Sequence, residues 1–371
     1  MKRVDDKKPE EDADPRTLVH TKNVQDYKIH LEDATIFDSP DYLFQLASAH
    51  ALLTCKNYSR ERGSVADPVW MANEARKIVA SDTNAYIKEV RQIRGKELAD
   101  LGMNLFWNVG KGAACDPICV IIHYQGRPEN PEIDFGVVGK GVTYDTGGLN
   151  IKVMMMEIMY QDKGGACAVL GALQGCIDLG IKKNIVFACA FADNAIGADA
   201  FKPNDILTAM NGLTVEIGNT DAEGRLVMAD TMTYIQRHYK PKKVAYIATL
   251  TGSCIIALGK GTAGLFSTDD EMVEAFEHAS EDAFEPVWHM PLNDEHRDSV
   301  KGRYGADLNN IGADRWGGSC QAAAFLERFI EDERPWAHLD IAGPVSYGKS
   351  ENGDASGYGA KLLLSYIDKC I

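Results

Sequence analysis

Apolar and polar residues follow two distinct patterns over most of the chain. Short, nearly continuous apolar runs are typical of buried strands and occupy residues 118–123, 135–138, 185–191 and 244–250. Helix-spaced apolar residues occupy 164–179 and 225–239, and a further helix is expected from 318 to about 330. Strands that alternate with helices in this way indicate an α/β fold, with a mainly parallel sheet covered by helices on both faces.

The chain before residue 100 has a different character. Residues 41–56 and 67–80 have helical apolar spacing, whereas residues 1–12 are strongly charged and lack an apolar segment. These first residues are therefore expected to form a tail, and not a signal peptide or membrane anchor. A total of 371 residues suggests one large or two modest domains.

Two polar, glycine-bearing stretches each lie between an expected strand and an expected helix. They are residues 139–148 and 219–226, and the second follows an Asn211-Gly212 pair that is typical of a hairpin turn. Catalytic and binding groups of α/β enzymes gather where strands end and helices begin. We therefore expect the chemistry of this chain to lie in these two stretches.

Both stretches contain carboxylates, Asp145 in the first and Asp221 and Glu223 in the second. Asp221 and Glu223 alternate with Ala222, so an extended backbone would project both carboxylates to one side, and Gly224 removes a Cβ where the backbone must pass close to another group. An isolated pair of this kind is more often a solvated surface loop. If Asp145 and Asp162 converge on the same cleft, however, four carboxylates share one site, and two divalent metal ions would neutralise them. On the residues alone, Lys140 would be a charge partner of Asp145.

Several blocks in the same order resemble the leucine aminopeptidase family, the two-metal cytosol aminopeptidases. The blocks are Gly-Lys-Gly-Val-Thr-Tyr-Asp-Thr-Gly-Gly at 139–148, Asn-Thr-Asp-Ala-Glu-Gly-Arg-Leu at 219–226, and shorter motifs at 248–252, 306–310, 317–319 and 336–343. The resemblance implies a catalytic metallopeptidase domain at residues 66–371. Residues 1–65 would be a tail and a remnant of the family's N-terminal domain, which is reduced or missing.

The resemblance also implies a role for each polar residue of the site. Asp145 and Glu223 would bridge two metal ions, Lys140 and Asp162 would complete one of them, and Asp221 would complete the other. Lys140 would then have to be a neutral amine, because an ammonium cannot bind a cation. Lys152 and Arg225 would be the catalytic residues. The implied ions are Zn²⁺ and/or Mn²⁺, with Mg²⁺ or Co²⁺ as further options, and Arg225 would hold a bicarbonate ion as general base.

The implied activity is hydrolysis of the N-terminal peptide bond of peptides through a metal-bridging hydroxide, with Lys152 stabilising the oxyanion. An apolar first residue such as Leu would enter a pocket formed by Met159, Thr249, Leu250 and Gly252, although the methionines could equally fill a core. Two alternatives stay open. One is a Cys-Gly-type dipeptidase, and the other is a relative that keeps the fold as a non-catalytic binding or scaffold protein.

The sequence departs from the family pattern between Lys152 and Asp162, where it is one residue shorter. The Asp-x-Gly-Gly pattern persists as Asp162-Lys163-Gly164-Gly165, so Asp162 and not Lys163 is aligned with the ligand. The family usually has an apolar residue where Lys163 stands. This departure bears on the shape of the pocket for the first side chain more than on the metal site.

The composition of the chain limits which partners and which cellular compartment are expected. Lys and Arg number 39 against 54 Asp and Glu, a net charge of −15, so nucleic acid is not an expected partner. The chain has nine cysteines, and several of them lie within apolar runs. Because the number is odd and these positions are packed, we expect reduced thiols in the cytoplasm rather than disulfides. No apolar run is long enough to span a membrane. The resemblance implies peptide substrates and a homohexamer. The loop at 350–357 could line the active-site cleft or could only connect the elements on either side of it.

Overall fold

The computed structural model describes residues 34–346 and 354–371. The expected tail at residues 1–12 and the first half of the loop at 350–357 lie outside these ranges. In the described part, α1 (Pro40–Arg60) and α2 (Pro68–Ala80) correspond to the two helices predicted near the N-terminus. The helix α1 begins after Ser39, whose side chain accepts a hydrogen bond from the main-chain N–H of Tyr42, and α2 begins after Asp67 in the same way.

An eight-stranded sheet forms the centre of the molecule, in the order β1-β2-β4-β3-β7-β11-β8-β9. The strands are β1 (Ile87–Arg94), β2 (Ile118–Gln125), β3 (Phe135–Asp145), β4 (Asn184–Asn194), β7 (Lys243–Ala248), β8 (Ala263–Phe266), β9 (Val287–His289) and β11 (Trp336–Asp340). The four central strands β4, β3, β7 and β11 are parallel, whereas β1, β2 and β8 join their inner neighbours antiparallel. The predicted α/β fold is confirmed, with a mixed rather than wholly parallel sheet.

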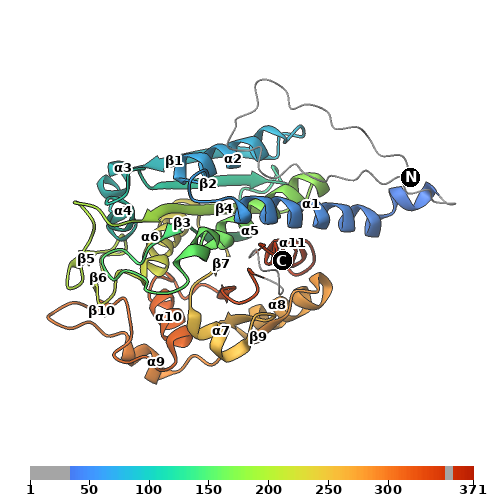
Figure 1. The fold of residues 1–371 in the computed structure, drawn as a ribbon. Helices are drawn as coiled ribbons and strands as arrows, with labels where there is room; N and C mark the ends of the chain where they lie inside the picture. Colours follow the sequence, from blue (N-terminus) through green and yellow to red (C-terminus); the bar gives the residue numbers. More distant parts are fainter. Residues whose placement is uncertain (1–33, 347–353) are drawn as a thin grey trace.

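Helices cover both faces of this sheet (Figure 1). One face packs against α1, α2, α5 (Gly164–Leu179), α8 (Asp270–Ala283) and α11 (Ala360–Lys369). The other packs against α3 (Lys96–Asp100), α4 (Asn104–Gly110), α6 (Glu223–Tyr239) and α10 (Gly318–Glu327). Shorter helices are η2 (Ala34–Asp38), η3 (Met156–Gln161), α7 (Gly252–Leu258) and α9 (Asp294–Ser299).

The sheet is buried on both faces, which explains why its strands read as continuous apolar runs. In β2, Val120 and Ile122 belong to the core on the α5 face, while Cys119 and Ile121 belong to the core on the α6 face. All four side chains are buried. A strand enclosed in this way has no polar face to alternate with, as expected for the middle of an α/β sheet.

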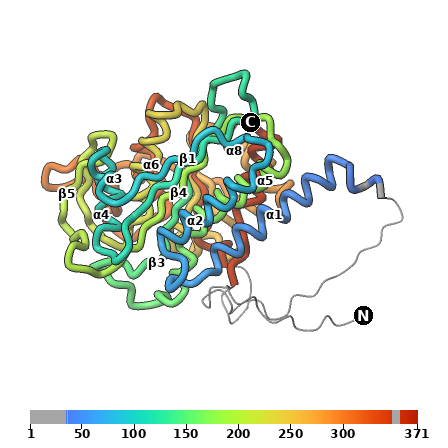
Figure 2. The backbone as a smooth tube through the Cα atoms, turned by 90° about the horizontal axis from the view of Figure 1, so that it is seen from above, coloured from blue at the N-terminus to red at the C-terminus, as the bar shows by residue number. Residues whose placement is uncertain are grey.

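The helix α1 packs into the same core as the helices that follow it. Its residues Ala47, Ala51 and Cys55 are buried in one cluster with α5, and the two helices lie side by side in both views (Figures 1 and 2). The division predicted at residue 65 stays a prediction. Among the described helices, none combines the length and the apolar character needed to cross a membrane.

A small second sheet has two strands before the acidic stretch in the sequence and one after it. It consists of β5 (Ile206–Thr208), β6 (Thr214–Glu216) and β10 (Leu308–Asn309), and β5 pairs antiparallel with β6. The hairpin predicted at Asn211-Gly212 is therefore confirmed. Two elements were predicted to extend too far along the chain. The strand expected at 244–250 ends at Ala248, and the helix expected from 318 to about 330 ends at Glu327.

Candidate metal centre

The candidate site lies at the ends of the central strands, where the sheet passes into loops and helices. Asp145 is the last residue of β3, and Lys140 lies within the same strand. Asp162 directly follows η3, and Glu223 is the first residue of α6. Parallel strands deliver these residues to a common edge, as expected for an α/β enzyme.

Three carboxylates converge there. Asp145, Asp221 and Glu223 each offer an oxygen, and these oxygens all lie within 4.8 Å of one another. The extended backbone predicted for the second stretch is wrong: Asp221 lies in a turn and Glu223 begins a helix. The turn and the first helical residue, rather than strand alternation, bring the two carboxylates together.

Lys140 occupies the inner half of the site. Its Nζ lies 2.9 Å from a carboxylate oxygen of Asp162 and 2.9 Å from one of Glu223, and it donates to the main-chain oxygen of Thr249 at 3.1 Å. Gly224 passes directly over this side chain, since a Cβ there would lie 2.5 Å from Lys140 Nζ. The absence of a side chain at Gly224 therefore makes room for Lys140, as the sequence suggested.

Lys152 occupies the outer half. Its Nζ lies 2.8 Å from a carboxylate oxygen of Asp145 and 2.5 Å from one of Asp221. The expectation drawn from the residues alone, that Lys140 pairs with Asp145, needs correction, because Lys152 makes that ion pair and Lys140 pairs with Asp162 and Glu223. Strand geometry places Lys140 five residues before Asp145, whereas the loop after β3 folds Lys152 back over the strand end.

The site holds more negative than positive charge. Among the described residues, the four carboxylates of Asp145, Asp162, Asp221 and Glu223 form ion pairs with two ammonium groups, those of Lys140 and Lys152. Burial and the neighbouring carboxylates raise the pKa of Asp162 and Asp221 above the usual value for aspartate. Burial alone would lower the pKa of both lysines, but the surrounding carboxylates outweigh it and raise the pKa instead.

The donor set fits divalent cations. Carboxylate oxygens are ligands for Mg²⁺ and Mn²⁺ as well as Zn²⁺, and the surplus negative charge in a buried cluster is stabilised by bound dications. Asp145, Asp221 and Glu223 supply the oxygens that lie close enough together for one ion. Asp162 lies beside this group on the inner side, where the Nζ of Lys140 is 2.9 Å from a carboxylate oxygen of Asp162 and 2.9 Å from one of Glu223.

Two asparagines that the sequence reasoning missed hold this arrangement together. Asn194, the last residue of β4, is completely buried, and its Nδ2 donates to Asp145 at 2.8 Å and approaches Glu223 at 3.4 Å. Asn310 accepts from the main-chain N–H groups of Gly218 and Asn219. A signal was present for Asn194, because it ends a long apolar run at the same sheet edge as Asp145.

Arg225 lies in the first turn of α6, two residues after Glu223. It is buried, its guanidinium donates to the main-chain oxygen of Asn310 at 2.7 Å, and its Nε has no protein acceptor among the described residues. Burial lowers its pKa to about 10. A buried guanidinium with donors to spare can hold a small anion.

Two of the predicted substrate-binding residues, Met159 and Thr249, form hydrogen bonds with Asp162 on the inner side of the site. The hydroxyl of Thr249 donates to Asp162 Oδ1 at 2.8 Å, Met159 belongs to η3, and Gly252 begins α7. The side chain of Leu250 instead packs against the core on the α6 face. Asp340 fixes this turn by accepting hydrogen bonds from the main-chain N–H groups of Leu250 and Thr251.

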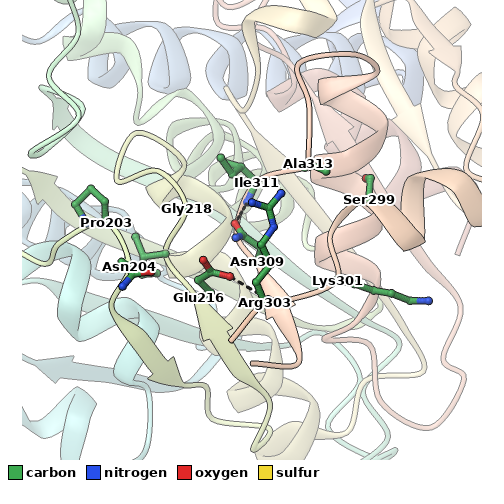
Figure 3. A pocket seen from close by; sticks show the side chains of 12 residues that line it. Pro203, Asn204, Glu216, Gly218, Ser299, Lys301, Arg303, Asn309, Ile311 and Ala313 are labelled. Atoms are coloured by element: carbon green, nitrogen blue, oxygen red, sulfur yellow. Dashed lines mark hydrogen bonds between the residues drawn. The ribbon is translucent and has the colours of Figure 1, made fainter. Parts of the chain in front are cut away.

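A separate cavity of about 300 Å³ lies beside the small sheet (Figure 3). Glu216, Gly218, Arg303, Asn309 and Ile311 are among its lining residues. The main-chain N–H of Arg303 donates to Glu216 at 3.0 Å. The cavity borders the loop that carries Asn310, but its lining includes none of the residues predicted for the metal site.

Comparison with known proteins agrees with this geometry. Residues 54–364 match the model of the cytosol aminopeptidase family, catalytic domain. The chain belongs to the cytosol aminopeptidase family. This match extends over most of the chain and includes every residue of the site described above.

Relatives in the cytosol aminopeptidase family are similar over much of the chain. A probable cytosol aminopeptidase of Actinobacillus succinogenes is 38% identical over 346 residues, which is 90% of this chain and 69% of the relative. Those of Fusobacterium nucleatum and Chlorobaculum tepidum are 42% and 41% identical, over 84% and 75% of this chain and 65% and 55% of the relatives. The chain thus spans roughly two thirds or less of the length of most of these proteins.

Proposed function

We propose that this protein is a metal-dependent aminopeptidase that hydrolyses the N-terminal peptide bond of peptides. The observation that carries the proposal is the convergence of Asp145, Asp221 and Glu223 within 4.8 Å, next to Asp162 and two lysines. A buried excess of carboxylates has little structural use by itself, because it destabilises the fold unless cations offset it. Membership of the cytosol aminopeptidase family supports the same reaction.

Two divalent ions, Zn²⁺ and/or Mn²⁺, would be held by Lys140, Asp145, Asp162, Asp221 and Glu223. When bound, they supply Lewis-acid polarisation of the scissile carbonyl and a water molecule that ionises near neutral pH. Lys140 would have to lose its proton to act as a ligand, and the arriving dications favour this loss. Asp162 and Thr249 are adjacent, so the substrate's free amine can be recognised on this inner side.

Lys152 and Arg225 would act on the reacting groups directly. Lys152 reaches Asp145 and Asp221 from a loop and is more exposed than Lys140, so its ammonium can turn towards the oxyanion of the tetrahedral intermediate. Arg225 would hold a bicarbonate ion as the general base, because its buried Nε has a donor to spare. The described site offers no imidazole for this role, since none of its residues is a histidine.

We further propose an apolar preference for the first residue, such as Leu. Met159 and Thr249 adjoin Asp162 on the inner side of the site, Gly252 begins the nearby helix α7 in the chain, and exposed apolar residues flank Lys152. Among these, the residues Ile151, Val153 and Met154 are 50%, 89% and 76% exposed. A cytoplasmic location and a homohexamer are parts of the same proposal. All nine cysteines are free thiols, which is compatible with that location.

The test is release of a chromophore from leucyl, alanyl and arginyl amides, with and without a chelator, followed by addition of Mn²⁺ or Zn²⁺. We expect hydrolysis that is fastest for the leucyl substrate, abolished by the chelator and restored by either metal. Cys-Gly hydrolysis measured in parallel would identify a dipeptidase. Hydrolysis that survives complete metal removal contradicts the proposed chemistry, and absence of hydrolysis in fully metal-loaded protein favours a binding role.

A further inference from the structure

Lys163 is an unusual residue for its position. Its side chain is completely buried, yet it carries an ammonium group. The Nζ donates to the main-chain oxygen of Glu61 at 2.7 Å and, at a shorter distance, to that of Tyr160. An ammonium buried against neutral carbonyl groups is costly to desolvate, so a purely apolar residue would be the cheaper way to fill this space.

The residue links two parts of the chain that are far apart in sequence. Glu61 caps the C-terminal end of α1, and Tyr160 lies in η3, whose end is followed by Asp162. Arg62 reinforces the link, because its guanidinium lies 3.9 Å from the centre of the Tyr160 ring. The connection between α1 and α2 is thereby held against η3.

The connection also contacts the end of β3. Gly63 packs so closely against Tyr144 that a Cβ at Gly63 would lie 2.8 Å from the Tyr144 ring, and the Tyr144 hydroxyl donates to the main-chain oxygen of Met156. Tyr144 precedes Asp145, and Met156 is the first residue of η3. Residues 61–64 therefore touch the segments that deliver both Asp145 and Asp162.

Asp162 lies between two restraints. On the sheet side, the Thr249 hydroxyl donates to its Oδ1 at 2.8 Å. On the helix side, its neighbour Lys163 is fixed to Glu61 and Tyr160. The Asp162 carboxylate faces Lys140 at 2.9 Å, and a shift of η3 would move it away from the cluster.

We propose that Lys163 is a positioning residue, which ties the α1–α2 connection to η3 and so holds Asp162 in place to bind a divalent ion. The inference rests on the proposed two-metal site and adds a residue to it that does not touch the metal. Binding at Asp162 and order in residues 61–64 are then thermodynamically coupled, so each stabilises the other.

The test compares Mn²⁺ binding to the wild-type protein and to Lys163→Met, with free Mn²⁺ followed by electron paramagnetic resonance. Met keeps an unbranched apolar stem of the same four-atom length and removes the terminal donor group. We expect the dissociation constant of one of two Mn²⁺ sites to rise about 10- to 100-fold, as for other residues that orient ligands, and the second site to stay unchanged.

A matched control separates positioning from general destabilisation. Val169→Ala lies in α5, the helix that follows Lys163, and truncates a fully buried side chain. We expect it to lower the urea midpoint without changing either Mn²⁺ site. If Val169→Ala weakens Mn²⁺ binding as much as Lys163→Met does, the effect reflects stability alone and the inference is wrong.

A second measurement needs only the wild-type protein and covers the case in which Lys163→Met does not fold. The main-chain N–H groups of Val65 and Ala66 donate to the oxygen of Arg62, so hydrogen exchange reports on order in the connection. We expect Mn²⁺ to lower the exchange rate of these two N–H groups. An exchange rate that is the same with and without Mn²⁺ would contradict the inference. If the wild-type protein binds no Mn²⁺, both the proposed function and this inference are wrong. If Lys163→Met binds Mn²⁺ at both sites as tightly as the wild-type protein does, only the inference about Lys163 is wrong.

Discussion

The two lysines of the site invite comparison because each pairs with two carboxylates of the same acidic cluster, Lys140 with Asp162 and Glu223 and Lys152 with Asp145 and Asp221. Lys140 projects from the middle of β3, and its side chain is 4% exposed. Lys152 projects from a loop, and its side chain is 17% exposed. The partners differ in the same way, since Glu223 is almost fully enclosed while the side chain of Asp221 is 29% exposed.

This difference explains why two identical residues suit different roles. A lysine on a central strand, flanked by Thr249 and Gly224, cannot move, and its charge state depends on what shares its cavity. A lysine on a partly exposed loop keeps its charge and can shift to meet an anion that forms during a reaction. Backbone rigidity and exposure, rather than residue type, separate the proposed ligand from the proposed catalytic group.

The largest expected effect concerns stability without metal. Lys140→Met leaves Asp162 and Glu223 buried without their ammonium partner, and we expect the free energy of unfolding to fall by about 3–5 kcal/mol. Lys152→Met is the matched control and should cost less, because water reaches Asp221. Urea unfolding in the presence of a chelator measures both. Equal losses of unfolding free energy in the two variants would mean that the inner and outer halves of the site do not differ in how burial affects their charges.

The second prediction concerns catalysis. We expect Lys152→Ala to lower kcat on the order of 10²-fold or more, through lost oxyanion stabilisation, while elemental analysis still finds both metals. Lys152→Arg keeps the charge and should lose less. Unchanged turnover in Lys152→Ala would reject the role proposed for this residue, and loss of a metal would assign it to the ligand set instead.

A third prediction tests the support of the inner half. Thr249→Val removes the hydroxyl that donates to Asp162, and we expect a loss of about 1.5–3 kcal/mol in the metal-free protein, the usual range for a hydrogen bond to a charged group. Thr251→Val removes the hydroxyl that donates to Asp340 and serves as control. Only Thr249→Val should also weaken Mn²⁺ binding, and a similar weakening in the control would contradict a local effect.

The smallest expected effect lies on the outer loop. Val153 follows Lys152 and is 89% exposed, so Val153→Ser should change the free energy of unfolding by no more than about 0.5 kcal/mol. Urea unfolding of this variant measures how little the loop contributes to the fold. A larger loss would show that the surroundings of Lys152 are as well packed as those of Lys140.

Local pattern was enough to predict much of the fold. The helix predicted at 164–179 matches α5, and the apolar runs match β2, β3, β4 and β7. The order of strands, the antiparallel edges and the packing of α1 on α5 were out of reach. They depend on contacts between distant residues, for which a single sequence holds no periodic signal.

The sequence by itself determined which groups are available: acidic residues in two glycine-bearing stretches, two lysines, one arginine, and a resemblance that assigns them roles. Only the tertiary structure decided how they pair. It joined Lys152 rather than Lys140 to Asp145, placed Asn194 between two carboxylates, and connected Lys163 to Glu61 across a hundred residues of chain. The physical reason is that spacing along the chain specifies strands and helices, whereas charge pairing depends on distances in space that form only when the sheet and its loops come together.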